Sequence, residues 1–193
     1  ITAILSEMKH DCKLVFEEDF VYLPLYYTME TASAAKLSEL MSLARPYSNN
    51  IAQDIFFYSK SSNIELSPMQ QEAVKTALGG GVLVITGGPG TGKTTIMKII
   101  MDIFQSHEYK IALCAPTGKA AKRLSESCGM EAKTLHRLLE VEVKDTQNQR
   151  FARNEYNPID ADVVIVDEMS MVDIILFGSL LKALKRGTCL IMA

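Results

Sequence analysis

The second half of the chain alternates between short apolar runs and longer segments with helical spacing. From Gly81 onward, four runs of strand-forming residues are separated by segments that predict helices: VLVIT, IALCA, VVIVD and TCLIM. Continuous apolar runs of this length are typical of strands that are buried on both faces. The alternation therefore predicts an α/β fold in which helices cover a parallel sheet. Ligands of such sheets bind beyond the carboxyl ends of the strands, and three of the four predicted strands end in residues of chemical interest.

The first half of the chain has a different pattern, and we expect residues 1–48 to form an accessory segment before a main domain at 49–193. The run KLVFEEDFVYLP predicts a hairpin that turns at Glu18 and Asp19. Residues 26–44 predict a helix, because Leu37, Leu40 and Met41 recur at helical spacing. The segment RPYSNN at 45–50 is interpreted as a linker.

Two further helices are predicted before the first strand of the main domain. The run IAQDIFFYSK predicts a short helix, and ELSPMQQEAVKTAL predicts another. Ser67 is the expected N-cap of the second helix, with Pro68 at its first position and Gln70 three residues after the cap.

Composition indicates a globular protein without a membrane span. Of the 193 residues, 48% are hydrophobic and 22% are charged, and no apolar run approaches the roughly 20 residues that span a bilayer. The four cysteines are widely scattered, which predicts reduced thiols in a cytoplasmic protein and no structural zinc site. No secretory leader follows Ile1, so we expect the chain to begin inside a longer protein.

The net charge of −3 is unevenly distributed along the chain. Residues 1–70 carry five basic and nine acidic side chains, whereas residues 110–137 carry six basic and two acidic ones. The basic excess could meet phosphates, or it could form a solvated helix face in which Lys122 pairs with Glu126.

The stretch GGPGTGKTT at 87–95 carries the clearest chemical signal. Gly87 to Thr94 fits G-x-x-x-x-G-K-T between a predicted strand and a predicted helix, which is the context that a phosphate-binding loop requires. Inward-facing backbone N–H groups and the helix N-terminus would hold phosphate oxygens. Lys93 would reach the outer phosphates, and the Thr94 hydroxyl would bind Mg²⁺. The residues expected around the phosphates are Gly88, Gly90, Thr91, Gly92, Lys93, Thr94 and Thr95. The alternative is a flexible glycine turn.

A pair of acidic residues ends the third apolar run. Asp167 is predicted to hold Mg²⁺, and Glu168 to orient and deprotonate an attacking water. The pair could instead be only a turn. No N-K-x-D motif for guanine is present, which favours ATP. These residues leave three functions open: an ATP hydrolase, an enzyme that transfers phosphate to a small acceptor, and a DNA-binding module with an unused loop.

Five motifs together resemble a known family. The motifs LSPMQQEAV, GGPGTGKTT, APTGKAAKRL, TLHRLLE and VVIVDEMSMVD follow the order and spacing of superfamily 1 DNA helicases. They are most similar to the RecD-like group, the α chain of exodeoxyribonuclease V and its relatives, over residues 64–193. The resemblance implies a partial RecA-like P-loop domain, use of ATP, and movement along single-stranded DNA from 5′ to 3′ in repair and recombination.

The resemblance also implies roles for residues outside the phosphate loop. Gln70 would bind the adenine edge, although its side chain could also cap its own helix. The residues implied to contact DNA are Pro116, Thr117, Gly118, Lys119, Thr134 and His136. Thr134 could be only an N-cap, and His136 only a core histidine.

The resemblance sets limits on this chain as well. It implies that TCLIM lies between the phosphate-loop strand and the Asp-Glu strand, and that a G-D-x-x-Q-L motif and a second motor domain follow Ala193. We therefore expect the fragment itself to have negligible ATPase activity and not to unwind DNA. In this family helical DNA-binding modules precede the motor, so residues 1–48 could end a winged-helix-like module. Whether other subunits of a helicase–nuclease complex bind is left open.

Overall fold

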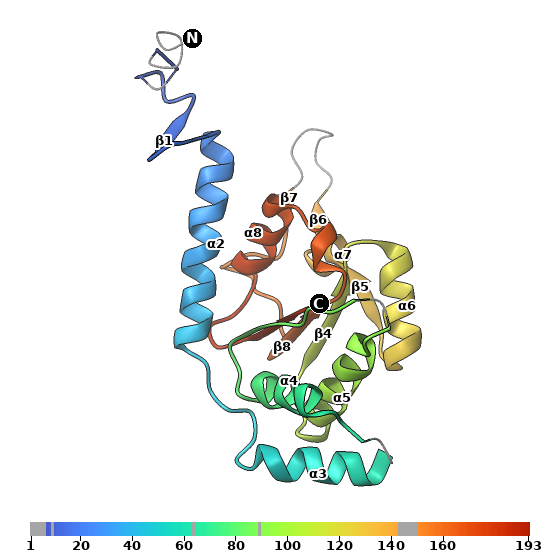
Figure 1. The fold of residues 1–193 in the computed structure, drawn as a ribbon. Coiled ribbons are helices and arrows are strands. Elements are labelled where there is room, and N and C mark those ends of the chain that lie inside the picture. Colours follow the sequence, from blue (N-terminus) through green and yellow to red (C-terminus); the bar gives the residue numbers. More distant parts are fainter. Residues whose placement is uncertain (1–6, 9, 63–64, 89, 143–149) are drawn as a thin grey trace.

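A five-stranded parallel sheet forms the centre of the protein (Figure 1). This computed structural model describes residues 7–8, 10–62, 65–88, 90–142 and 150–193. The elements in chain order are β1 (Val15–Glu17), β2 (Phe20–Tyr22), α2 (Pro24–Ser42), α3 (Ile51–Ser62), α4 (Pro68–Leu78), β3 (Val82–Val84), α5 (Lys93–Ser106), β4 (Ile111–Ala115), α6 (Gly118–Cys128), β5 (Ala132–Thr134), α7 (Leu135–Leu138), β6 (Val141–Glu142), β7 (Arg150–Phe151), β8 (Val163–Val166), the 3-10 helix η1 (Met169–Met171), α8 (Ile174–Lys182) and β9 (Cys189–Met192).

The strand order in the central sheet is β3-β9-β8-β4-β5, and every neighbouring pair is parallel. All four strands predicted from the apolar runs are present, so the predicted α/β class is confirmed. β9 lies between β3 and β8, as the resemblance implied. The edge strand β5 was not predicted, because its three residues AKT form no apolar run. The small antiparallel pair β6–β7 was not predicted either.

The sheet separates two hydrophobic layers. Along β8, Val163 and Ile165 belong to one buried cluster, whereas Val164 and Val166 belong to the other. Helices α3, α4, α5 and α6 contribute to the first cluster, and α2, α7 and α8 contribute to the second. Since both faces are covered, the strands read as continuous apolar runs.

The N-terminal elements agree with the predicted hairpin and helix. β1 and β2 pair antiparallel, and Glu18 adopts a positive φ of 50° at the predicted turn. Helix α2 follows and carries the hairpin at the end far from the sheet (Figure 1). Leu40 near the other end of α2 is fully buried in the cluster that contains the sheet residues of β8 and β9. The division at residue 48 stays a prediction.

The predicted start of α4 is confirmed in atomic detail. The Ser67 hydroxyl accepts a hydrogen bond from the Gln70 N–H at 3.3 Å, and the Ser67 N–H donates to Gln70 Oε1 at 3.0 Å. Pro68 occupies the first helical turn. This reciprocal cap fixes the direction in which Gln70 leaves the helix. Within the described residues, no helix has the length and apolar character needed to cross a membrane.

Candidate nucleotide-binding site

The glycine-rich segment lies where β3 leads into α5, as the motif requires. Gly90 and Gly92 have φ angles of 76° and 86°, in the left-handed region that glycine adopts without steric cost. A Cβ atom on Gly87 would lie only 2.6 Å from Thr91 Oγ1. The chain can therefore turn tightly here only with glycines. The 14-residue helix α5 begins directly afterwards, so the positive end of its dipole faces the loop.

The Lys93 side chain folds back over this loop. Its ammonium group donates to the carbonyl oxygen of Gly87 at 2.5 Å and to that of Gly88 at 3.0 Å. Thr91 Oγ1 also donates to the Gly88 carbonyl, at 2.9 Å. Lys93 thus already lies over the loop that would hold phosphates. Gly87 was absent from the predicted set, although it is the first glycine of the motif.

The acidic pair follows β8 and continues its backbone ladder for one residue. The Asp167 N–H donates to the carbonyl oxygen of Cys114 at 3.0 Å, which fixes Asp167 beside the end of β4. Glu168 then adopts a φ of 56°, a left-handed conformation that is uncommon for a residue with a side chain. Its N–H donates back to Asp167 Oδ1 at 3.0 Å.

The Asp167 carboxyl lies in a mixed electrostatic environment. Burial raises its pKa, the hydrogen bond from the Glu168 N–H lowers it, the Glu168 charge raises it, and the Lys93 charge lowers it. Lys93 and Asp167 therefore lie close enough to interact, although 74 positions separate them in sequence. The fold brings the two predicted motifs together at the carboxyl ends of β3 and β8.

Gln70 is the third part of this arrangement. A Cβ atom on Gly92 would lie 3.2 Å from Gln70 Nε2, so the amide of this side chain lies against the phosphate loop. The cap of α4 uses Oε1 of the same amide, and Nε2 is the atom that faces the loop. The capping bond thus holds Gln70 at the site and does not withdraw it.

The residues implied to contact DNA follow the neighbouring strands β4 and β5. Thr117 Oγ1 caps α6 by accepting from the Ala120 N–H at 3.2 Å. Thr134 Oγ1 caps α7 by accepting from the Arg137 N–H at 3.2 Å, so the alternative role as an N-cap is observed. The His136 ring is partly exposed, with its centre 6.1 Å from that of Phe151. Thr117, Thr134 and His136 therefore lie at the same end of the sheet as the phosphate loop.

Of the six basic residues at 110–137, Lys110 lies at the opposite end of the sheet from the phosphate loop. Lys110 precedes β4 and pairs with Asp160 at 2.6 Å, at the amino end of the strand, whereas Lys119 follows its carboxyl end. The grouping of residues 110–137 by sequence alone therefore overestimates the positive charge beside the loop. Lys122 lies 4.0 Å from Glu126 in an exposed pair on α6, as the solvated-face alternative predicted.

Thr94 and Asp167 supply a hydroxyl and a carboxylate, the hard oxygen ligands that suit Mg²⁺. In the described part of the chain, no three His, Cys, Asp or Glu side chains are grouped so that they could hold a metal ion. A cation at this site would therefore depend on phosphate oxygens and water for its other ligands, which is how Mg²⁺ binds in nucleotide sites.

A phosphate loop after one parallel strand, with an acidic residue at the end of a strand two places away, defines the class of P-loop nucleotide-binding α/β domains. The model of a family described as AAA domain matches residues 70–193, and the chain belongs to this family. Membership of this family implies nucleotide use, so the prediction of a nucleotide cofactor is confirmed at that level.

The chain is also similar to named helicases. It is 38% identical over 170 residues to the ATP-dependent RecD2 DNA helicase of Deinococcus radiodurans, covering 88% of this chain and 23% of that protein. It is 32% identical over 201 residues to the RecBCD enzyme subunit RecD of Mycobacterium tuberculosis, covering 92% and 33%. A crystal structure of Pif1 helicase from Candida albicans aligns with a TM-score of 0.49 at 27% identity, covering 67% of this chain and 32% of that one. The RecD-like resemblance is confirmed, and the chain spans a quarter to a third of the length of these curated relatives.

Proposed function

We propose that this chain is the nucleotide-binding part of a RecD-like helicase that hydrolyses ATP and moves along single-stranded DNA from 5′ to 3′. The observation that carries the proposal is the position of the acidic pair after β8, at the same edge of the sheet as the phosphate loop that follows β3. Relatives named as DNA helicases support the assignment, and the named RecBCD subunits among them support other subunits as partners.

The loop and α5 would bind the triphosphate. Backbone N–H groups and the positive end of α5 attract phosphate oxygens. Lys93 would exchange the carbonyl oxygens of Gly87 and Gly88 for oxygens of the outer phosphates, which are stronger acceptors because they are charged. Gln70 Nε2 would donate to the adenine edge while Oε1 keeps its bond to Ser67.

Thr94 and Asp167 would hold Mg²⁺ together with the phosphate oxygens. The bound ion would neutralise charge on the phosphates. The half-buried position of Asp167 limits competition from bulk water for its carboxylate.

Glu168 would act as the general base. It would orient a water molecule and accept its proton as the water oxygen bonds to the γ-phosphorus. The bond between the γ-phosphorus and the oxygen bridging to the β-phosphate would break in the same step, and ADP would leave. The left-handed backbone of Glu168 turns its exposed side chain away from the hydrogen-bond ladder of β8. Such backbone strain is found preferentially at functional sites.

Single-stranded DNA would pass over the ends of β4 and β5. Pro116 and Thr117 precede α6 at that edge, and Gly118 and Lys119 begin it. Thr134 is the N-cap of α7, and His136 lies in its first turn. Backbone contacts by Lys119 would supply a sequence-independent attraction. Residues 1–48 would act as an accessory segment on the motor domain at 49–193. Cys114, Cys128 and Cys189 are buried free thiols, which supports a cytoplasmic location.

The test uses the longer protein that contains this chain. ATP hydrolysis should rise when single-stranded DNA is added, and Lys93→Ala should abolish the hydrolysis. Lys75→Ala, an exposed lysine on α4, is the matched control and should leave it unchanged. Hydrolysis that ignores DNA would count against a translocating motor. Transfer of labelled phosphate to a small metabolite would favour a phosphotransferase instead.

A further inference from the structure

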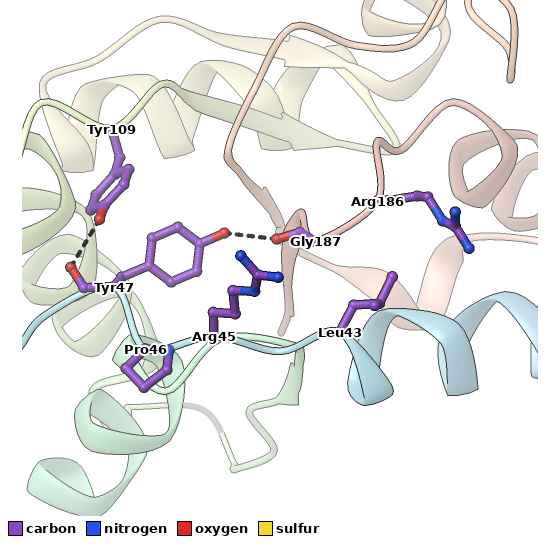
Figure 2. Close-up of a pocket in the computed structure, with 7 residues that line it drawn as sticks. All are labelled: Leu43, Arg45, Pro46, Tyr47, Tyr109, Arg186 and Gly187. Atoms are coloured by element: carbon purple, nitrogen blue, oxygen red, sulfur yellow. Dashed lines mark hydrogen bonds between the residues drawn. The ribbon is translucent and has the colours of Figure 1, made fainter.

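A separate pocket, drawn in Figure 2, lies where β4 and β9 begin, at the end of the sheet opposite the phosphate loop. Its volume is about 590 Å³, within the range of ligand-binding sites. It is lined by the segment that joins α2 to α3 and by the turns before β4 and β9, through Leu43, Arg45, Pro46, Tyr47, Tyr109, Arg186 and Gly187. The whole sheet separates this pocket from the phosphate loop.

The walls of the pocket are fixed by hydrogen bonds. The Tyr47 hydroxyl lies 2.8 Å from the Asp162 carbonyl oxygen and 3.0 Å from the Gly187 carbonyl oxygen, and its single proton can be shared between them. The Tyr109 hydroxyl donates to the Tyr47 carbonyl oxygen at 3.1 Å. Both hydroxyls are thus used inside the protein, and the tyrosines present mainly ring carbons. The pocket is therefore formed before any ligand arrives.

Close packing also fixes the backbone of Arg45. Gly80 has a φ of 81°, and a Cβ atom there would lie 2.5 Å from the Arg45 carbonyl oxygen. A glycine at this position lets the connecting segment lie directly on the end of α4. The Arg45 side chain leaves this fixed backbone and extends toward Gly187 (Figure 2).

Arg45 is available for a ligand. Within the described residues, its guanidinium group makes no hydrogen bond or ion pair. The neighbouring Arg186 differs, because its Nε donates to Glu39 Oε1 at 2.7 Å and its side chain points away from Arg45 (Figure 2). An arginine binds carboxylate or phosphate through two parallel N–H groups.

The surrounding charges select among anions. Glu39 pairs with Arg186 and Lys36. Asp160 pairs with Lys185 and Lys110. Because these carboxylates are already paired, Arg45 is the cation left to bind an anion at the pocket. One free guanidinium matches one carboxylate and offers a polyanion such as DNA a single point of attachment.

We propose that this pocket binds a single carboxylate carried on an apolar group. Arg45 would hold the carboxylate, and the rings of Tyr47 and Tyr109 would pack against the apolar group. The carboxylate could end a chain or small acid, or belong to an acidic side chain within a peptide, and the two probes below distinguish these sources.

The experiment titrates the longer protein with two probes, N-acetylphenylalanine and the amidated dipeptide acetyl-aspartyl-phenylalanine amide. Binding is followed by calorimetry and by ligand-observed NMR. At least one probe should bind with a dissociation constant on the order of 1 mM or tighter. Arg45→Gln should weaken this binding at least tenfold, and Arg45→Lys should weaken it less. Tighter binding of the first probe indicates a terminal carboxylate, and tighter binding of the second indicates an internal one.

Three outcomes would overturn the proposal. Neither probe binds, or Arg45→Gln binds as the unchanged protein does, or N-acetylphenylalanine amide, which lacks the carboxylate, binds as tightly as the acid. Lys75→Gln on α4 is the control for an unspecific loss of charge. ATP hydrolysis should be the same in Arg45→Gln, so failure here is distinguishable from failure of the proposed helicase function.

Discussion

At the scale of single residues, Glu168 has the most unusual environment of the acidic turn. It combines a left-handed backbone with an exposed carboxylate directly after a strand that is buried along its whole length. A non-glycine residue in this conformation costs on the order of 1 kcal/mol or more, and the surrounding structure must compensate for it. Here the bond from its N–H to Asp167 Oδ1 and the bond from the Met169 N–H to the Ala193 carbonyl oxygen hold the turn.

Replacing this carboxylate tests its role directly. Glu168→Gln should lower ATP hydrolysis by a factor of roughly 10² to 10⁴, because the amide cannot accept the proton of the attacking water. Nucleotide affinity should change little, since the phosphate loop is intact. Phosphate release and nucleotide titration measure the two effects in the longer protein. Glu155→Gln, an exposed residue before β8, is the control, and equal losses in both variants would refute the assignment.

At the scale of elements, Tyr47 fixes the segment between α2 and α3 to the sheet. Its hydroxyl lies within hydrogen-bond distance of two carbonyl oxygens and also accepts a hydrogen bond from the Cys189 N–H at 3.2 Å, at the start of β9. The ring packs edge-on against Phe104 of α5 and against Tyr109. A segment that the sequence suggests is only a linker thus joins several elements.

Removing this hydroxyl should destabilise the fold. Tyr47→Phe keeps the ring but leaves the Cys189 N–H and two carbonyl groups without this partner, at a cost of about 1–3 kcal/mol in the free energy of unfolding. Urea denaturation measures the change. Tyr156→Phe is a matched control because Tyr156 is 90% exposed, and it should change the stability little. A loss as small in Tyr47→Phe as in the control would contradict the anchoring role.

Asp160 forms ion pairs with Lys110, just before β4, and with Lys185, just after α8. Hydrogen bonds from Lys110 and then from Lys185, supported by their charges, lower its pKa from 3.8 to about 2. A folded-state pKa below the unfolded value stabilises the protein above the unfolded pKa. This contribution is lost as the pH falls through the folded pKa.

Because the pKa of Asp160 is lowered by folding, the stability that this carboxylate adds should be present at neutral pH and lost in acid. Asp160→Asn should melt at a lower temperature than the unchanged protein near neutral pH, and the difference should shrink between about pH 4 and pH 2. Melting curves over this range in low salt measure it, and Asp11→Asn in the turn before β1 is the control. A difference that stays constant down to pH 2 would show that the effect is not ionic. The effect should be modest because the group is exposed.

At the scale of the whole molecule, the two ends of the parallel sheet differ in chemistry. The phosphate loop, the acidic turn and the start of α6 lie at the carboxyl ends of the strands, and the pocket beside Tyr47 lies at their amino ends. Parallel strands make this separation possible, because all their carboxyl ends meet at one end of the sheet. DNA contacts are therefore expected only at the first end.

The salt dependence of DNA binding tests this expectation. Affinity of the longer protein for single-stranded DNA should fall by about 0.7 log units per neutralised phosphate for each tenfold rise in salt. Lys119→Ala should reduce this slope by about 0.7, whereas Lys110→Ala at the opposite end should leave it unchanged. Equal slopes in the two variants would place DNA elsewhere on the molecule.

Much of the nucleotide site could be predicted because its signals are local. The glycines of the loop, the helix that follows and the reciprocal cap between Ser67 and Gln70 depend on residues a few positions apart. The strand ends before Asp167 and before Pro116 follow from apolar runs of four or five residues. The edge strand β5 escaped prediction because it is short and half-exposed, so burial does not impose an apolar pattern on it.

Other features depend on contacts that no local pattern records. The conformation of Glu168 results from its place between β8 and η1, and glutamate itself does not favour it. The approach of Gln70 to Gly92 depends on how α4 packs beside α5. Lys110 was grouped with Lys119 by sequence, although the length of β4 separates them.

The sequence alone determined the phosphate loop, the acidic pair and the α/β class, because each is encoded by residues that are neighbours along the chain. Tertiary structure decided which distant groups meet. Tyr47 contacts carbonyl groups that are 115 and 140 positions away in sequence. The charge of Lys93 lowers the pKa of Asp167, although β9 lies between the strands β3 and β8 that precede these two residues. Such contacts depend on burying both faces of the central strands β8 and β9 at once, a condition that no single segment satisfies by itself.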